Sequence, residues 1–139
     1  MARYLDDRRY EESGDVGLID IGDNAQPIIT RDDGSQIDQT TVPQVTADQN
    51  NYAIPPGELI RLSTDASRTF TGFSGSRPGL FVICNVGSQN VVIANDNAGS
   101  TAENRVLCHS GANITLNANE SVLITYDFQS SRWRTIGFV

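Results

Sequence analysis

The sequence predicts an all-β fold, a compact antiparallel β-sandwich that is jelly-roll-like in size and follows an extended N-terminal arm. Short apolar runs recur at a spacing of about ten residues after residue 57, which is the rhythm of a sandwich or barrel. Residues that favour turns (glycine, asparagine, serine and aspartate) separate these runs. No window keeps a helical period for long, and the best candidate, residues 100–105, is too short for more than one turn.

The apolar runs define about eight expected strands. They are residues 58–63, 68–73, 80–86, 90–95, 104–109, 113–117, 120–127 and 132–138. The strand over 80–86 is apolar on both sides, so we expect a central strand with both faces covered. Gly72, within the second strand, predicts a bulge or a close approach of another backbone segment. Turns at 117–119 and 129–131 would join the last three strands.

Charge divides the chain into an arm and a body. Residues 1–50 hold 11 of the 17 acidic residues and 4 of the 10 arginines, so their net charge is −7 (4 − 11). Residues 51–139 hold 6 of each and are neutral. The Pro55-Pro56-Gly57 segment interrupts regular structure and stiffens the chain. We therefore expect residues 1–56 to be an acidic arm with a linker, and residues 57–139 to be the β-sandwich domain.

The arm contains two short aliphatic patches, residues 16–21 and 27–30. Neither patch can bury enough surface to fold alone. We expect the arm to become ordered on a partner, although a solvated tail with chance hydrophobic residues is the alternative. The expected docking anchors are Leu18, Ile19, Ile21, Ile28 and Ile29.

Composition argues against several partners and compartments. An acidic arm disfavours binding to nucleic acid or to an anionic membrane, because both need a basic surface. No apolar stretch is long enough to cross a bilayer, and no apolar segment of a signal peptide follows the first residues. We therefore expect folding in a cytosol, where Cys84 and Cys108 would be free and buried. A disulfide between them stays open as an alternative.

The sequence predicts no enzyme, no catalytic residue, no cofactor and no metal site. His109 is the single histidine, and no nucleophile-elbow motif accompanies it. A histidine at a strand end near solvent is the simpler interpretation. The two cysteines and the histidine lack the spacing of a tetrahedral zinc site. The acidic residues of the body fall at expected turns and strand ends, and no two of them form a pair suited to glycoside hydrolysis.

Trp133 is the most informative side chain of the last strand. The two-residue period places it in the core, with Arg132 and Arg134 outside. A sugar platform or an interface anchor is the alternative for Trp133. The flanking arginines are candidates for salt bridges between subunits, with Asp127 or Glu120 as partners.

A series of segments in the body also carries a resemblance. In order they are Leu59-Ile-Arg-Leu-Ser63, Arg68-Thr-Phe-Thr-Gly72, Phe81-Val-Ile-Cys-Asn-Val-Gly87, Asn90-Val-Val-Ile-Ala94, Ser100-Thr-Ala-Glu-Asn-Arg105, Gly111-Ala-Asn-Ile-Thr-Leu116, Glu120-Ser-Val-Leu-Ile-Thr-Tyr-Asp127 and Ser130-Ser-Arg-Trp-Arg134. Together they resemble a β-sandwich module of tailed-bacteriophage virion surface proteins, of the head decoration, head fibre and tail-fibre type. The closing pair of segments is the most characteristic, and residues 1–50 match no family.

The resemblance implies assembly on a virion surface, commonly as a homotrimer, after synthesis in the host cytoplasm. The chain is short and has no internal repeat, which favours a capsid decoration or head-fibre subunit over a long tail fibre. The arm would then dock on the major capsid protein or another virion protein. The alternative is a receptor-binding or carbohydrate-binding module of a tail fibre or tail tip, with a host-surface glycan as ligand.

Overall fold

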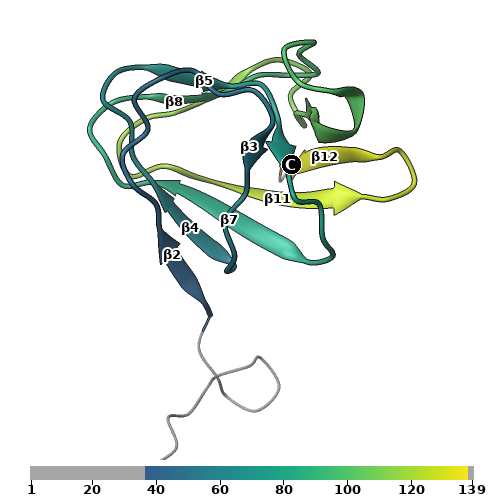
Figure 1. Cartoon of the computed structure of the whole chain (residues 1–139), viewed down its shortest axis with the longest axis horizontal. Coiled ribbons are helices and arrows are strands. Elements are labelled where there is room, and N and C mark those ends of the chain that lie inside the picture. The colour runs from purple at the N-terminus through teal and green to yellow at the C-terminus, as the bar shows by residue number, and fades with distance from the viewer. Residues whose placement is uncertain (1–36, 138–139) are drawn as a thin grey trace, which may run out of the picture. The chain divides into compact units, whose positions relative to one another are not determined.

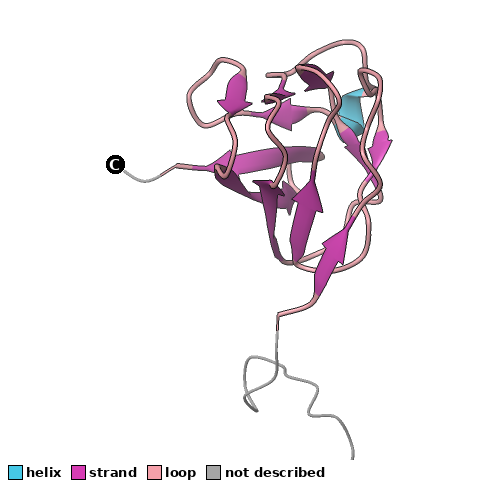
Figure 2. Cartoon of the chain, turned by 90° about the vertical axis from the view of Figure 1, so that its left-hand side faces the viewer, coloured by secondary structure: helices cyan, strands magenta, loops and turns pink. Residues whose placement is uncertain are grey.

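The computed structural model describes residues 37–137, and every regular element in this range except one is a β-strand. The exception is a 3₁₀ turn at Ala102–Asn104, which is the single helical turn in Figure 2. The chain divides into two units, residues 1–36 and 37–139. The all-β class expected from the sequence is confirmed for the described part of the chain.

The largest sheet has six strands in the order β2–β4–β7–β11–β12–β9. Figure 1 labels the first five of them. Their bounds are β2 Gln39–Thr41, β4 Leu59–Leu62, β7 Leu80–Asn85, β11 Ser121–Asp127, β12 Arg132–Ile136 and β9 Val106–Leu107. A three-stranded sheet contains β10 (Ile114–Leu116), β8 (Val91–Ile93) and β5 (Arg68–Phe70), in that order. A two-stranded sheet pairs β3 (Tyr52–Ala53) with β6 (Phe73–Ser74).

The expectation of a wholly antiparallel fold is wrong, because the sheets are mixed. The pairs β7–β11, β11–β12 and β8–β10 are antiparallel. The pairs β2–β4, β4–β7, β5–β8, β3–β6 and β9–β12 are parallel. After β4 the chain leaves the six-stranded sheet for β5 and β6, and returns as β7 beside β4 in the same direction. Such a crossover makes parallel neighbours, whereas the sequence pattern suggested hairpins between successive strands.

The body begins earlier than expected, at residue 37 instead of residue 57. β2 pairs with β4, and the Val42 amide donates to the Arg61 carbonyl at 3.1 Å. Val42, Val45 and Ile54 are buried in the core. None of the three belongs to a long alternating apolar run, and their backbone hydrogen bonds place them in the body. Side-chain periodicity therefore gave no sign of them.

The second expected strand is interrupted. β5 ends at Phe70 and pairs with β8, whereas β6 begins at Phe73 and pairs with β3. Gly72 lies between them, where a Cβ atom would collide with the Asn104 carbonyl oxygen and the Ser100 side chain. The predicted close backbone approach at Gly72 is confirmed.

One hydrophobic core fills the space between the sheets. Within the hydrophobic core cluster, the residues exposed by 3% or less are Ile60, Leu62, Phe70, Phe73, Phe81, Ile83, Val91, Ile93, Val106, Leu116, Ile124 and Trp133. Trp133 is fully buried, and its indole Nε1 donates to the Phe73 carbonyl at 2.8 Å. The rings of Phe73, Phe81 and Tyr126 meet the indole edge to face. The inward orientation predicted for Trp133 is confirmed, which leaves it no role as a sugar platform.

Candidate binding surfaces

The β11–β12 hairpin brings three of the predicted site residues together. Asp127 ends β11, and its Oδ2 atom accepts a hydrogen bond from Arg134 Nε at 2.7 Å. The same carboxylate accepts hydrogen bonds from the Ser130 hydroxyl at 2.8 Å and from the Gln129 amide at 2.9 Å. Arg132 is the cross-strand neighbour of Asp127. The carboxylate therefore holds the turn and the next strand in one arrangement.

These hydrogen bonds change the acidity of Asp127. The Arg134 guanidinium, the Ser130 hydroxyl and the Gln129 amide lower the pKa of its carboxyl from the usual 3.8 to about 2. Each of them favours the charged form of the carboxyl. The hairpin consequently keeps its charged arrangement in mild acid.

The other candidate residues have partners of their own. Arg132 Nε lies 3.9 Å from Asp96 Oδ1, and an Nη atom of Arg105 lies 3.7 Å from the same oxygen. Glu120 stands at the opposite end of β11 and accepts hydrogen bonds from the backbone and side-chain nitrogens of Asn117, each at 3.1 Å. Within one chain, Arg134 is thus paired with Asp127, while Glu120 is not part of the group. The expected docking anchors at 18–29 lie outside the described residues.

Phe128 is a surface residue that the sequence analysis missed. Its side chain is 59% exposed and meets the Tyr126 ring edge to face, with centroids 4.8 Å apart. It directly follows β11, at the start of the turn. The sequence did carry a sign of this exposure, because Phe128 is an apolar residue next to an expected turn. Phe128 is therefore a better candidate than Trp133 for an aromatic contact with a ligand.

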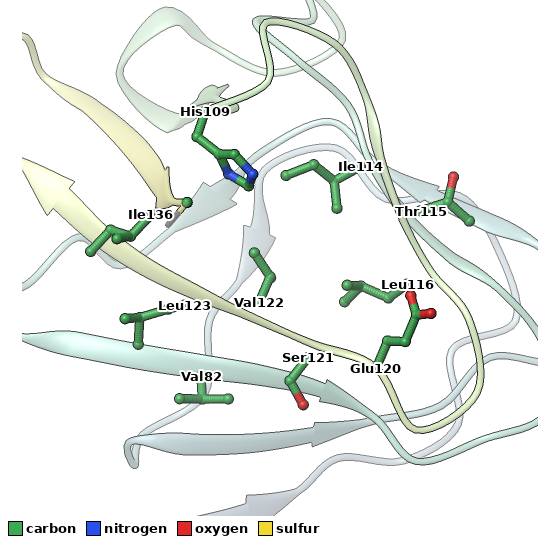
Figure 3. Close-up of a pocket in the computed structure, with 11 residues that line it drawn as sticks. Val82, His109, Ile114, Thr115, Leu116, Glu120, Ser121, Val122, Leu123 and Ile136 are labelled. Carbon is green, nitrogen blue, oxygen red and sulfur yellow. The ribbon is translucent and has the colours of Figure 1, made fainter. Parts of the chain in front are cut away.

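A groove of about 530 Å³ lies where β10, β11 and the end of β12 meet (Figure 3). Its lining is mainly aliphatic, with His109 at one end and Glu120 at the other. The His109 ring contacts the Thr135 hydroxyl through Nδ1 at 2.8 Å, and Thr135 Oγ1 also accepts from the His109 amide at 2.8 Å. His109 is exposed at the mouth of the groove, as the simpler interpretation had it.

The groove does not assemble a catalytic group from its polar residues. The His109 ring is bonded to Thr135, while the Glu120 carboxylate is bonded to Asn117. A histidine that activates a nucleophile would need a hydroxyl or thiol nucleophile on one side and an orienting carboxylate on the other. Among residues 37–137, no three His, Cys, Asp or Glu side chains are grouped so that they could hold a metal ion.

The two cysteines are free and differ in their surroundings. Cys108 is buried, and this burial raises the pKa of its thiol to about 11. Cys84 is half-buried on β7.

In the part of the chain that the structure describes, no helix is long and apolar enough to cross a membrane. No family model matches the chain, and neither does any curated protein.

Proposed function

We propose that the chain is a structural protein at the surface of a virion, a capsid decoration or head-fibre subunit. Its leading segment docks on the major capsid protein or another virion protein, and its β body contacts further copies of itself. One observation carries the proposal: three segments of the virion-module resemblance fall on neighbouring strands. Residues 81–87, 120–127 and 130–134 include most of β7, β11 and the start of β12, which adjoin in the six-stranded sheet.

A two-layer sandwich is the finer description of the fold within this proposal. The six-stranded sheet would be one layer and the three-stranded sheet the other. Both sheets contribute to the same core, with Ile83 and Trp133 from one and Phe70 and Ile93 from the other. The parallel pairs distinguish this arrangement from the usual antiparallel jelly roll.

The distribution of charge supports docking by the leading segment. The net charge of −7 lies within residues 1–50, and the aliphatic patches at 16–21 and 27–30 lie in the same stretch. A segment of this composition gains little by folding on itself and can bury its aliphatic side chains on a partner. The neutral body would then stand clear of the shell.

Limited digestion with trypsin tests the docking. Trypsin cleaves after arginine, and the leading segment offers Arg3, Arg8, Arg9 and Arg31. We expect rapid cleavage after Arg31 in the free full-length protein, and an intact chain when the protein is bound to its particle. Mass spectrometry of the fragments identifies the cut, and cleavage within 37–137 serves as the internal control. A free protein whose leading segment resists trypsin as well as the body does would contradict the proposal.

Phe128 supports the second candidate, a receptor-binding or carbohydrate-binding module. The exposed Phe128 ring offers a stacking surface, and Asp127, which precedes it in the chain and is bonded to Arg134, offers hydrogen-bonding groups. A glycan array probed with the native chain and with Phe128→Ser tests it. Binding that the substitution abolishes would favour this function, and an array without hits would exclude the glycans that it displays.

A further inference from the structure

Two arginines lie side by side where β12 meets β9 in the six-stranded sheet. Arg132 begins β12, and Arg105 directly precedes β9, the parallel neighbour of β12. The Trp133 amide donates to the Arg105 carbonyl at 3.0 Å, which fixes the two backbones next to each other. The residues after the arginines, Val106 and Trp133, are fully buried. Both arginine side chains therefore point to the opposite, outer face of the sheet.

Asp96 is a carboxylate that both arginines share. Its Oδ1 atom lies 3.7 Å from an Nη atom of Arg105 and 3.9 Å from Nε of Arg132. Its backbone has a φ of 41°, in the left-handed region, and its amide donates to the Val106 carbonyl at 2.7 Å. A charge-assisted hydrogen bond between such groups is about 2.7–2.9 Å long. Asp96 therefore offsets part of the positive charge without forming a hydrogen bond to either arginine.

The three side chains keep unused hydrogen-bonding groups. Within residues 37–137, Arg105 donates only through Nε, to the Ser100 carbonyl, and Arg132 only through one Nη atom, to the Ser131 carbonyl. The carboxylate of Asp96 accepts no hydrogen bond from this part of the chain. Both arginine side chains are only 25% exposed. Guanidinium groups that are partly shielded from water and have free N–H donors attract an oxyanion more strongly than fully exposed ones do.

The charge of this site suits a ligand that carries one negative charge. Two guanidinium groups and one carboxylate leave a net charge of +1 (2 − 1). On the same face, Arg134 and Asp127 are paired at 2.7 Å and cancel. Glu103, in the preceding 3₁₀ turn, forms no ion pair with an arginine of the described residues. A single carboxylate matches this charge, and its two oxygens fit the fork of N–H donors that arginine presents.

We propose that Arg105 and Arg132 bind the carboxylate of an acidic sugar, while Asp96 accepts a hydrogen bond from a hydroxyl of the same sugar. The inference rests on the second candidate function, the carbohydrate-binding module, and names its ligand class. An acidic peptide also carries carboxylates, but Asp96 repels the further acidic groups that such a peptide brings. A sugar hydroxyl, in contrast, donates to a carboxylate.

The test is a nuclear magnetic resonance titration of the ¹⁵N-labelled full-length protein with sodium glucuronate, and with glucose as the neutral reference. We expect saturable shifts of the two arginine Nε–H signals with glucuronate and none with glucose. The double variant Arg105→Gln/Arg132→Gln should bind glucuronate about tenfold more weakly or worse, because it loses both charge-assisted contacts. The double variant Arg61→Gln/Arg68→Gln removes the same charge elsewhere and should bind as the native chain does.

Asp96→Asn distinguishes a ligand site from an internal ion pair. Asparagine tolerates the left-handed backbone and keeps an oxygen that accepts a hydrogen bond from a sugar hydroxyl. It removes the negative charge that competes with the ligand, so we expect glucuronate to bind about three- to tenfold more tightly. Unchanged or weaker binding of glucuronate would contradict the inference.

Far-UV circular dichroism verifies that each variant is folded, and Arg132→Gln alone replaces the double variant if that is not. A native chain that does not bind glucuronate overturns the inference, as does a folded double variant that binds it like the native chain. Acetate or an acidic peptide that binds as tightly as glucuronate also overturns it, since the sugar then contributes nothing. A glycan array with hits among neutral glycans alone would support the carbohydrate-binding function and still overturn this inference.

Discussion

The two faces of the six-stranded sheet carry the same kinds of side chain with different surroundings. On the inner face, Ile83 and Ile124 are exposed by 2% or less and pack in the core. On the outer face, Val82 and Leu123 occupy the adjacent positions and are only half-buried. Apolar side chains on both faces favour burial, but the packing of the sheets buries only the inner face. The surface left over is where the chain is expected to meet another molecule.

Removal of the largest inner side chain should have the largest effect. Trp133→Ala deletes a fully buried indole and its hydrogen bond to the Phe73 carbonyl. We expect a loss of about 3–5 kcal/mol in the free energy of unfolding, because large-to-small changes in a core leave a cavity. Urea denaturation followed by far-UV circular dichroism measures it. A loss below about 1 kcal/mol, typical of surface sites, would show that the indole is not part of the core.

A matched pair on β11 compares the two faces directly. Ile124→Ala removes an inner side chain, and we expect it to cost about 2–5 kcal/mol in the free energy of unfolding. Leu123→Ala removes its outer neighbour, and we expect about 1 kcal/mol or less at a protein concentration low enough to keep the chain monomeric. Parallel urea titrations give both values. Equal losses would mean that the outer face is buried in the single chain.

Thr135 is a polar residue on the inner face, 5% exposed. Its hydroxyl accepts from the His109 amide and contacts the His109 ring, each at 2.8 Å. Thr135→Val keeps the shape and leaves the His109 amide without this acceptor, so we expect a loss of about 1–2 kcal/mol in the free energy of unfolding. Thr115→Val, at the exposed middle position of β10, is the control and should change the free energy of unfolding little. Equal free energies of unfolding for the two variants would show that the Thr135 hydroxyl does not stabilise the fold.

The smallest predicted effect concerns pH. The pKa of Asp127 is lowered to about 2 in the folded chain, so its ionised form favours folding above the unfolded pKa. That contribution is lost as the pH falls from about 4 towards about 2. We expect the urea midpoint of Asp127→Asn to fall less over this interval than that of the native chain. Asp65 and Glu120, whose pKa values are also lowered, keep part of the pH dependence. Identical pH profiles would contradict the role given to Asp127.

The positions of the strands could be predicted from the sequence, but the pairing of one strand with another could not. The two-residue period located β4, β7, β11 and β12 to within one or two residues at most ends. It reports which side chains share a face, but it carries no information on which strand lies alongside. The parallel partner of β4 is β7, which follows only after the chain has visited another sheet. β2 and β3 are too short to show any period, so the body began earlier than expected.

The candidate binding surfaces were also predictable only in part from the sequence. Trp133 between two arginines could be oriented from alternation alone, since a terminal strand has one dry face. The pairing of Arg134 with Asp127 needed the hairpin register, which aligns residues on opposite sides of a turn. The half-buried apolar residues on the outer face of the six-stranded sheet also needed the strand register, because Val82 and Leu123 are neighbours on β7 and β11 but lie far apart in the chain. Phe128 was visible as an apolar residue in a turn and was overlooked.

Thiol labelling of Cys84 and Cys108 tests most directly whether the two faces of the six-stranded sheet differ in exposure in the single chain. Cys84 lies two residues beyond Val82 on the same face, whereas Cys108 is buried with a raised pKa and reacts slowly. The account predicts that Cys84 is labelled faster than Cys108 in the native chain, and that the two rates approach each other in concentrated urea. A native chain in which Cys84 is labelled as slowly as Cys108 would contradict it.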